Sequence, residues 1–525
     1  MFDSAKGLKK LYLSMYRTSK ENTYKHYRRT HRRDTDTEIL PVNPLISIVV
    51  PVYNADENVL AECVNSVRAQ IYKNWELIMI DDHSPKTECV AALHKYDNDP
   101  KIITGYHDKN CQIAKTTNDC IALAHGEYIA FMDCDDVIES DALYLMVKKA
   151  VNENCDVVYT DDDHMSFDGK KFSYPTLKPD WAPDTLMSLM YTGHFSMYRK
   201  SIIDEIGGLG EGVDGSQDYD LTLRFTEKTD RIGHVPYVLY HWRMGENSTA
   251  GNPEAKLYAY KAAYEAKKRR IERLNLPAKL DYLDKYYQTR VIYIPDPGVK
   301  ITIEDIAKIR AGESYGAAVN RIFKSSTADV VLVYDSTIIN SGTEIESIKS
   351  TLAGMALRKH AGLVSPLIMY KNYVSEAGIG YLPSKRAFGR LDNGNGSVRE
   401  LNFISGDVCA CSSVCFAMRR SVFLEAGDFD ESLSDYGTVI EYSLRLLEKG
   451  YFNILRTDAE ISANKMEKQN VISKGETEKI LSMHPHFKKD PFYSDVYCDF
   501  RHNISDTVLE HVYRALVKVT GRTKQ

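Results

Sequence analysis

Apolar runs that end in acidic residues are the feature of this sequence that most constrains its fold. The stretch LISIVVPVYN, at residues 45–54, is continuously apolar and rich in β-branched residues, as is typical of a strand buried on both faces of a parallel sheet. Two later runs, WELIMIDDHS and EYIAFMDCDD, share this character, and KIITGYH is a weaker candidate. Helix-like stretches separate the runs, one at residues 59–70 and one that closes at Gly126. This alternation predicts an α/β domain with a doubly wound, mainly parallel sheet.

The acids at the ends of these runs predict a ligand site. Open parallel sheets bind ligands at the carboxyl ends of their strands, and here those ends carry Asp81, Asp82, Asp133, Asp135 and Asp136. Two carboxylates one residue apart can both ligate a hard divalent cation, and Mg²⁺ and Mn²⁺ commonly join such carboxylates to phosphates. The pattern Asp-Cys-Asp-Asp therefore predicts a metal–diphosphate site. An acidic turn without a ligand is the alternative for this motif taken alone.

Glycine-rich phosphate loops are missing from the sequence. The first apolar run is not followed by G-x-G-x-x-G, and the chain has no Walker-type GKS or GKT. These absences argue against a nicotinamide-dependent dehydrogenase and a P-loop NTPase. A nucleotidyltransferase is also disfavoured, because the segment PVYNADEN is not a Gly-rich basic loop.

A second acidic motif, GSQDYDLTLR, places Asp218 and Asp220 at the start of a predicted amphipathic helix. Asp218 would serve either as a helix cap or as a general base, which must lie within hydrogen-bond reach of an attacking hydroxyl. For Asp220 we favour a structural charge in the first helical turn.

The segment LYHWRMGENSTA places His241, Trp242 and Arg243 after a predicted strand. A His/Arg pair beside an acidic site would neutralise a leaving diphosphate, and the indole would form a wall for a sugar ring. The alternative is a core tryptophan and an arginine held in an ion pair.

The second half of the chain repeats part of the first. The segment FSMYRKSIIDEIGGL, from Phe195, aligns with FAMRRSVFLEAGDF, from Phe416, and the alignment carries Asp220 onto Glu441. Earlier, ADVVLVYDST at residues 328–337 mirrors the run that ends in MDCDD. A repeat of this length predicts a second α/β domain that is a shortened copy of the first.

The order of the motifs VVPVYN, IDDHS, MDCDD and GSQDYDLTLR resembles family 2 glycosyltransferases, which have the nucleotide-sugar-binding GT-A fold. The segments YTDDDHMS, LKPDWAPDTLMSLMYTGHFSMYRKS and LYHWR further resemble the bacterial rhamnosyltransferase-like branch that builds O-antigen, capsule or cell-wall polysaccharides. This resemblance covers residues 45–250. It implies an inverting, metal-dependent hexosyl- or deoxyhexosyltransferase. Its donor would be a UDP- or dTDP-linked sugar, and its acceptor a hydroxyl of a growing or lipid-linked cell-surface polysaccharide.

The resemblance also assigns roles to individual residues. The Asp-x-Asp motif of Asp133 and Asp135 would bind ribose and the metal–diphosphate, with Asp136 as a further ligand of Mg²⁺ or Mn²⁺. Asp218 stands where the family keeps its catalytic base, although Gln217 replaces the usual acidic neighbour. The remaining donor-binding residues would be Pro51 and Tyr53 at the base, Asp81 and Asp82 at the base or ribose, and His241 and Arg243 near the diphosphate.

The second copy resembles the same superfamily but lacks its acids. Asp335 alone matches the acid cluster, Thr337 stands at a metal-ligand position, and Val439 aligns with Asp218. We therefore predict that the second domain does no chemistry, and leave open whether it binds acceptor glycan, mediates a homodimer or buttresses the first domain. The alternative for the whole chain is a non-catalytic sugar-nucleotide- or glycan-binding scaffold that partners another glycosyltransferase. The intact acids of the first copy favour the enzyme.

Four segments are predicted along the 525 residues. They are a basic helical leader (1–44), a catalytic GT-A domain (45–285), a degenerate GT-A-like domain (286–500) and a C-terminal amphipathic helix (501–525). A long helix at residues 252–275 would close the catalytic domain, with its Lys/Arg cluster in solvent. The apolar face of the C-terminal helix favours a core or dimer contact.

Charge and cysteine content bear on the partners and the location. Residues 1–34 carry a net charge of +7, whereas the whole chain carries −6, which argues against nucleic acid. The basic leader would contact an anionic membrane surface or pack on the catalytic domain, and both interpretations stay open. Scattered cysteines and the lack of a long apolar run or a secretory signal predict a cytoplasmic protein, either free or peripheral on the inner face of the plasma membrane.

Overall fold

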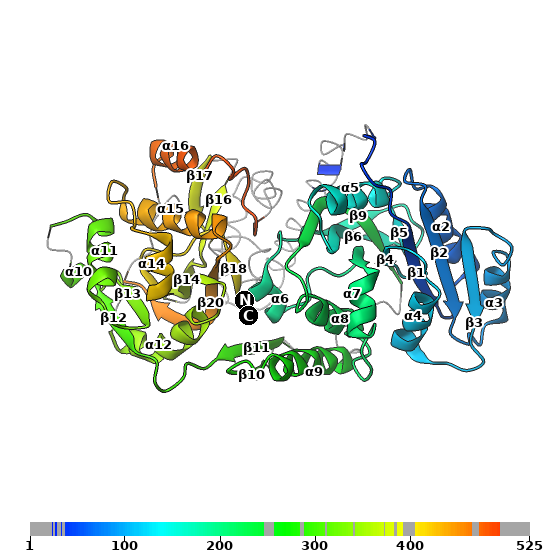
Figure 1. The fold of residues 1–525 in the computed structure, drawn as a ribbon, viewed down its shortest axis with the longest axis horizontal. Helices are drawn as coiled ribbons and strands as arrows, with labels where there is room; N and C mark the ends of the chain where they lie inside the picture. Colours follow the sequence, from blue (N-terminus) through cyan, green and yellow to red (C-terminus); the bar gives the residue numbers. More distant parts are fainter. Residues whose placement is uncertain are drawn as a thin grey trace, which may run out of the picture.

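The protein consists of two α/β regions joined by a long helix and a β-hairpin (Figure 1). The computed structural model describes residues 24, 27–28, 33, 37–245, 257–283, 288–309, 312–339, 342–371, 373–382, 386–391, 405–464 and 472–493. The predicted C-terminal helix at 501–525 and most of the leader lie outside these residues. Among the described residues, no helix is long and apolar enough to cross a bilayer.

The first sheet has the strand order β3-β2-β1-β4-β8-β6-β9-β5, with β7 paired to β6. Its strands are β1 (Ile46–Val52), β2 (Trp75–Asp81), β3 (Ile102–Tyr106), β4 (Tyr128–Phe131), β5 (Val137–Ile138), β6 (Val157–Ser166), β7 (Phe172–Thr176), β8 (Ser196–Arg199) and β9 (Ile232–Met244). Strands β3, β2, β1 and β4 run parallel, whereas β8 is antiparallel to both of its neighbours. The predicted α/β class and its apolar strands are confirmed, and the sheet is parallel in its first half and mixed beyond it.

Helices cover both faces of this sheet, which explains why its strands read as continuous apolar runs. Along β1, Ile48 and Val50 pack in one core with α2 (Glu57–Arg68), α3 (Thr87–His94) and α5 (Ala142–Asn152). Val49 points to the opposite core, with α4 (Gln112–Ala122), α7 (Lys200–Ile206) and α8 (Gln217–Phe225). Successive side chains of a strand point to opposite faces, so every residue of β1 from Ile46 to Val50 is buried.

The second sheet has the order β12-β13-β19-β14-β20-β18, with β15 paired to β14. Its strands are β12 (Ile301–Asp305), β13 (Val330–Tyr334), β14 (Ala361–Tyr370), β15 (Tyr373–Glu376), β18 (Gly406–Val408), β19 (Cys415–Arg419) and β20 (Phe452–Ser462), and β16 (Ile379–Leu382) pairs separately with β17 (Ala387–Arg390). Its helices are α10 (Ile306–Ile309), α11 (Tyr315–Ser325), α12 (Gly342–Ala356), α14 (Arg420–Ala426), α15 (Asp435–Glu448) and α16 (Lys474–Met483).

Five strands of the second sheet repeat five strands of the first. The series β12-β13-β19-β14-β20 has the same neighbours and the same parallel or antiparallel senses as β1-β4-β8-β6-β9. In the described part of the chain β12 is an edge strand, whereas β2 and β3 lie beyond β1. The second region is therefore a shortened copy, in which the described residues form no counterpart of β2 and β3.

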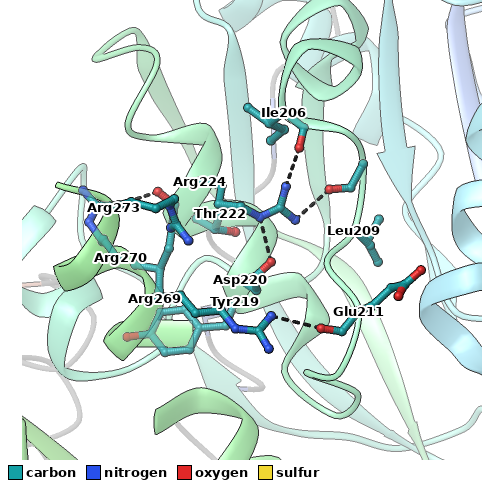
Figure 2. Close-up of polar contacts among 12 residues, drawn as sticks. Ile206, Leu209, Glu211, Tyr219, Asp220, Thr222, Arg224, Arg269, Arg270 and Arg273 are labelled. Atoms are coloured by element: carbon teal, nitrogen blue, oxygen red, sulfur yellow. Dashed lines mark hydrogen bonds and ion pairs between the residues drawn. The ribbon is translucent and has the colours of Figure 1, made fainter. Parts of the chain in front are cut away.

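A buried ion pair recurs at the same place in both copies. Figure 2 shows Arg224 of α8 donating to Asp220, with a Nε–carboxylate distance of 2.7 Å, and to the carbonyl of Ile206 at the end of α7. In the second copy Arg445 of α15 donates to Glu441 at 3.0 Å and to the carbonyls of Ala426 and Asp428, at and just beyond the end of α14. The alignment of Asp220 with Glu441 is confirmed, and Asp220 has the structural role that we favoured.

Some cationic side chains of helix α9 (Leu257–Arg273) are buried, whereas the sequence predicted them in solvent. Lys267 is only 2% exposed, and its ammonium donates to the carbonyls of Ser188 and Thr289. Arg270 donates to the Leu223 carbonyl of α8, and Figure 2 shows the neighbouring Arg269 donating to the Glu211 carbonyl. The prediction of a wholly solvated cluster was wrong, because these long side chains reach unpaired carbonyls at the ends of other elements.

One hydrophobic cluster crosses between the two regions. Its members include Tyr159, Leu186, Tyr219 and Leu223 from the first region, Val291 and Tyr293 from the hairpin, and Leu352, Val364 and Ile454 from the second region. The proposed boundary at residue 285 falls between the hairpin strands β10 (Ala278–Leu283) and β11 (Gln288–Tyr293). The second region therefore shares a core with the first.

Candidate active site

A pocket open to solvent lies at the carboxyl ends of β1 and β4, where the sequence predicted a site. Its walls include Pro51, Asp133, His194, Gln217 and Asp218. Strand β4 leads into the segment that carries Asp133, and Asp218 lies in the first turn of α8. The structure thus brings the predicted base and one acid of the Asp-x-Asp motif to a single pocket, although 85 residues separate them in sequence.

The three acids after β4 form a cluster. Asp133, Asp135 and Asp136 each place a carboxylate oxygen within 4.8 Å of the others. Asp136 is buried, and its carboxylate accepts from the Tyr240 hydroxyl at 2.6 Å and from the Arg243 amide at 2.7 Å. Asp135 is exposed and Asp133 partly so. Oxygen donors with this spacing, one held from behind and two facing solvent, suit a hard divalent cation such as Mg²⁺ or Mn²⁺.

Electrostatics at the cluster also favour a cation. Burial raises the pKa of Asp136 well above its ordinary value, and the charges of Asp133 and Asp135 raise it further. Partial desolvation and the Asp133 charge raise the pKa of Asp135 in the same direction. Like charges held this close destabilise one another, and a bound divalent cation would remove that cost.

Arg243 supports the acid cluster from behind. Its guanidinium donates to the Asp135 carbonyl at 2.7 Å, to the Phe167 carbonyl at 2.7 Å and to the Glu62 carboxylate at 2.6 Å. The side chain is buried, and all of these partners belong to the protein. These contacts indicate that Arg243 positions the loop of Asp135, and contact with a diphosphate stays a prediction.

His241 lies on the other face of β9 from the acid cluster. Its Nδ1 is 2.5 Å from the Asp163 carboxylate and its Nε2 is 3.2 Å from that of Glu139. Burial lowers the pKa of His241, but the hydrogen bonds and charges of both acids outweigh it and raise that pKa overall. Its role in donor binding stays a prediction that these contacts do not support.

Leader residues complete the network around His241. The Tyr24 hydroxyl donates to Asp163, and Arg28 lies 3.8 Å from Asp163 and 3.4 Å from Glu139. Arg33 lies 3.2 Å from Glu139. The described part of the leader therefore packs on the catalytic region, which is one of the two predicted interpretations.

Glu139→Gln is expected to lower the free energy of unfolding by about 3 kcal/mol at pH 7, because Arg28, Arg33 and His241 lose a shared counter-charge. Burial raises the pKa of Glu139, but these cations lower it overall from 4.5 to about 2. The carboxylate therefore stabilises the fold above pH 4.5, and this contribution is lost as the pH falls through 2. Urea unfolding at pH 7 and pH 3 measures the effect.

The matched control for this prediction is Glu153→Gln, which removes an exposed carboxylate at the end of α5. We expect it to change stability by less than about 0.5 kcal/mol. Equal effects of the two variants at pH 7, or a Glu139→Gln effect that does not shrink at pH 3, would contradict the assignment.

Asp81 and Asp82 are both buried at the end of β2. Asp82 accepts from the amides of Cys111 and Gln112, at 2.7 and 2.9 Å, and so caps α4. Its carboxylate also lies 2.9 Å from His107, and Asp82, His107 and Cys111 form a second group with metal-ligand atoms. Both ring nitrogens of His107 already have carboxylate partners, since Asp119 lies 3.2 Å from Nε2, so these contacts account for the group without a metal.

The two remaining base-pocket candidates lie beside the acid cluster. Pro51 lines the pocket. Tyr53 is 51% exposed, and its backbone contacts the thiol of Cys134, within the acid motif. An exposed aromatic ring next to the acid cluster is suited to stacking on a nucleotide base, and this role of Tyr53 stays a prediction.

Asp218 has the surroundings of a base. The N-cap of α8 is Ser216, so Asp218 is not the capping residue, and its carboxylate accepts a hydrogen bond from the adjacent Tyr219 amide at 2.8 Å. Desolvation raises the pKa of Asp218 above its ordinary value, His194 opposes this shift and Asp133 adds to it. A raised pKa makes a carboxylate a better proton acceptor at neutral pH.

Two site residues, His194 and Tyr240, were missed by the sequence analysis. His194 Nε2 lies 4.0 Å from the Asp133 carboxylate, and its ring stacks on Tyr240 at 5.3 Å between centroids. The Tyr240 hydroxyl accepts from the Asp133 amide at 3.2 Å while it donates to Asp136. The sequence signal that could have found Tyr240 is the alternation of side chains along β9, which places Tyr240 and Trp242 on the face opposite His241. The indole of Trp242 lies 6.1 Å from the His194 ring.

A comparison with known families finds a match within the first region. A model of glycosyl transferase family 2 matches residues 47–207, from β1 through α7, and includes the acid cluster. Residues 47–207 are therefore similar to family 2 glycosyltransferases, the family that the motifs resemble. The match ends before Asp218.

Curated relatives extend the similarity to most of the chain. The O-antigen biosynthesis protein RfbC of Myxococcus xanthus is 27% identical over 474 residues, which cover 78% of this chain and 36% of that protein. The uncharacterized protein y4gI of Sinorhizobium fredii is 38% identical over 44% of this chain and 26% of its own length. The chain thus spans well under half of these relatives.

Among solved structures, the mannosyltransferase PcManGT of Pyrobaculum calidifontis, in complex with GDP-Man and Mn²⁺, aligns with a TM-score of 0.36. Its sequence identity is 14%, over 51% of this chain and 76% of that chain.

Proposed function

We propose that this protein is an inverting, divalent-metal-dependent glycosyltransferase. It would move a sugar from a UDP- or dTDP-linked donor to a hydroxyl of a growing or lipid-linked cell-surface polysaccharide. The observation that carries the proposal is that Asp133 of the acid cluster and Asp218 of α8 line one pocket in a family 2 domain. The O-antigen role in the name of the Myxococcus relative supports the class of acceptor.

The mechanism follows from the chemistry of these side chains. Asp218 accepts the proton of the acceptor hydroxyl, so that this oxygen can attack the anomeric carbon from the face opposite the leaving diphosphate. One displacement of this kind inverts the anomeric configuration. Asp133, Asp135 and Asp136 would hold Mg²⁺ or Mn²⁺, which supplies positive charge to the departing nucleoside diphosphate. Tyr240 and Arg243 hold the acid loop in place through the contacts described above.

The second candidate is a non-catalytic scaffold that binds a sugar nucleotide or glycan. The second region illustrates how this fold can lose the acids needed for catalysis, because Thr337 and Val439 align with Asp135 and Asp218. The first region keeps all of these acids, which favours the enzyme. In this proposal residues 45–285 are catalytic and residues 286–500 are not.

A thermal-shift screen tests the proposal directly. UDP-, dTDP- and GDP-sugars would be added to the whole protein, each with Mn²⁺, with Mg²⁺ and with EDTA. A donor at 100 times its Kd should stabilise the fold by about 2.7 kcal/mol, and only with metal present. Binding followed by release of nucleoside diphosphate on addition of acceptor glycan would support the enzyme, binding without release would support the scaffold, and no shift with any donor would contradict both.

The proposed location is the cytoplasm, with peripheral contact to the inner membrane face through residues 1–34. Deleting these residues would also remove Tyr24, Arg28 and Arg33, which pack on the first region. A loss of membrane binding in that deletion could not be told apart from a loss of folding. Replacing Lys6, Lys9, Lys10 and Arg17 by Gln avoids this. If association with anionic vesicles is unchanged in that variant, membrane contact through this segment is excluded.

A further inference from the structure

A short helix of the first region, α6 (Pro183–Ser188), is capped by a residue of the second region. The Asp407 carboxylate on β18 accepts from the backbone amides of Asp184 and Thr185, both at 2.9 Å. The Thr185 hydroxyl donates to the same carboxylate at 3.2 Å and accepts from the Asp407 amide at 3.1 Å. These four contacts join segments 222 residues apart, and both side chains are buried.

The contact is close along the whole length of α6. A Cβ added to Gly406 would lie 2.5 Å from the Thr185 hydroxyl oxygen, so only glycine permits this approach. The Ser188 hydroxyl donates to the Ser405 carbonyl at the other end of the helix. Arg358, which follows α12, forms an ion pair with Asp184. The second region therefore contacts α6 both in its first turn and at its last residue.

Helix α6 also contacts α8, which carries the proposed base, and α9. The Tyr219 hydroxyl donates to the Leu186 carbonyl, and Tyr219 directly follows Asp218 on α8. Lys267 of α9 donates to the Ser188 carbonyl at 2.8 Å. Helix α6 is thus held between the second region and the helix that bears the proposed base.

The chain that follows α6 forms one wall of the catalytic pocket. Met190, Gly193 and His194 all line it, and His194 faces Asp133 at 4.0 Å. Lys178 holds this wall through the carbonyls of Thr192 and His194, at 2.6 and 2.7 Å. The position of α6 therefore sets where this wall begins.

We propose that Asp407 is a positioning residue for the active site, and that the degenerate second region acts on catalysis by fixing α6 and the pocket wall at residues 190–194. A helix of six residues is not stable in isolation, and the N-cap residue Ala182 offers no side-chain cap of its own. The position of α6 must therefore come from its neighbours, and the carboxylate of Asp407 supplies the missing cap. The effect on transfer rests on the proposed function, whereas the effect on the pocket wall does not.

The test compares Thr185→Val and Asp407→Ala with the wild-type protein. Thr185→Val keeps the shape of the side chain but leaves the Asp407 amide unpaired, and Thr185→Ser restores the hydroxyl. We expect amide hydrogen exchange in residues 183–194 to speed up about tenfold in Thr185→Val and Asp407→Ala, and to return close to wild type in Thr185→Ser. We expect kcat to fall about tenfold in the same two variants, with the affinity for UDP and Mn²⁺ unchanged.

Asn320→Leu is the matched control for a general loss of stability. Asn320 is buried in the second region, where it exchanges hydrogen bonds with the backbone of Phe429 and donates to the Glu431 carboxylate. It should lower the unfolding temperature without faster exchange at residues 183–194 or a lower kcat in the folded protein.

Two results would overturn the proposal. One is wild-type exchange at residues 183–194 in folded Thr185→Val and Asp407→Ala. The other is a fall in kcat for Asn320→Leu as large as that for Thr185→Val. If no sugar nucleotide proves to be a substrate, the proposed function fails while the exchange experiment still decides whether Asp407 positions the wall.

Discussion

Asp218→Asn is expected to lower kcat for sugar transfer by about 10²–10⁴-fold, because an amide cannot accept the proton of the attacking hydroxyl. The variant should bind nucleoside diphosphate and Mn²⁺ with near wild-type affinity, since the metal-ligating acids are untouched. Its stability should be unchanged or slightly higher at pH 7, because desolvation raises the pKa of Asp218 and the folded protein therefore holds this charge at a cost. Initial-rate kinetics, calorimetric titration with UDP and Mn²⁺, and urea unfolding measure the three effects.

Asp220→Asn is the matched control, two residues further along the same helix. Asp220 is buried against Arg224, so its loss should destabilise the fold by about 2–4 kcal/mol. The folded variant should keep kcat within about threefold of wild type. The pair of variants separates chemistry from structure on one helix. Wild-type turnover by Asp218→Asn, or equal loss of kcat in both variants, would contradict the role of Asp218 as the base.

Asp133→Asn and Asp135→Asn are expected to remove the response to metal. Each variant takes away one oxygen ligand and one charge, and transfer should fall by about 10²-fold or more. In EDTA the Asp133→Asn protein should be as stable as wild type or more so. The charge of Asp133 raises the pKa of both Asp135 and Asp136 in the wild-type protein, and the variant removes this repulsion. Mn²⁺ with UDP should raise the unfolding temperature of the wild-type protein and leave that of the variants unchanged.

The control for the metal prediction is Asp168→Asn, which removes an exposed carboxylate in the turn between β6 and β7. It should keep the full Mn²⁺ response. An Asp133→Asn protein that is still stabilised by Mn²⁺ with UDP would show that the metal, if it binds, binds elsewhere.

The two copies of the fold show which residues serve structure and which serve chemistry. The register of β4 with β8 pairs Tyr128 with Arg199, and that of β13 with β19 pairs Val330 with Arg419. The structural ion pair on the following helix is present in both copies. Of the acids proposed for catalysis, the second copy keeps only the counterpart of Asp133, which is Asp335, although the surrounding strands are the same. The loss of the other acids without loss of the fold supports a chemical role for them.

The fold and the acids of the site were predictable from local sequence. Buried parallel strands such as β1 give long apolar runs, and residues that follow such strands meet at one sheet edge, so the places of Asp133 and Asp136 could be predicted. The internal repeat predicted the second sheet in the same way.

The rest of the site depends on contacts between distant segments. His194 reaches the pocket because Lys178 and α6 place its loop there, and nothing in the local sequence TGHFSM indicates this. Strand β9 pairs with both β6 and β5, and only that pairing shows which face His241 takes. The burial of Lys267 follows from carbonyls that end other elements. Periodicity in one segment carries no information on such partners.

The most direct test of the central claim is release of nucleoside diphosphate from a sugar nucleotide identified in the binding screen. With acceptor glycan and Mn²⁺ or Mg²⁺, the wild-type protein should release nucleoside diphosphate, and this release should stop on addition of EDTA. The Asp133→Asn and Asp218→Asn variants should both fail to release it. Of these two variants, only Asp218→Asn should still bind the donor in a metal-dependent manner. Release that continues in EDTA, or that persists in either variant, would contradict a metal-dependent glycosyltransferase built on these acids.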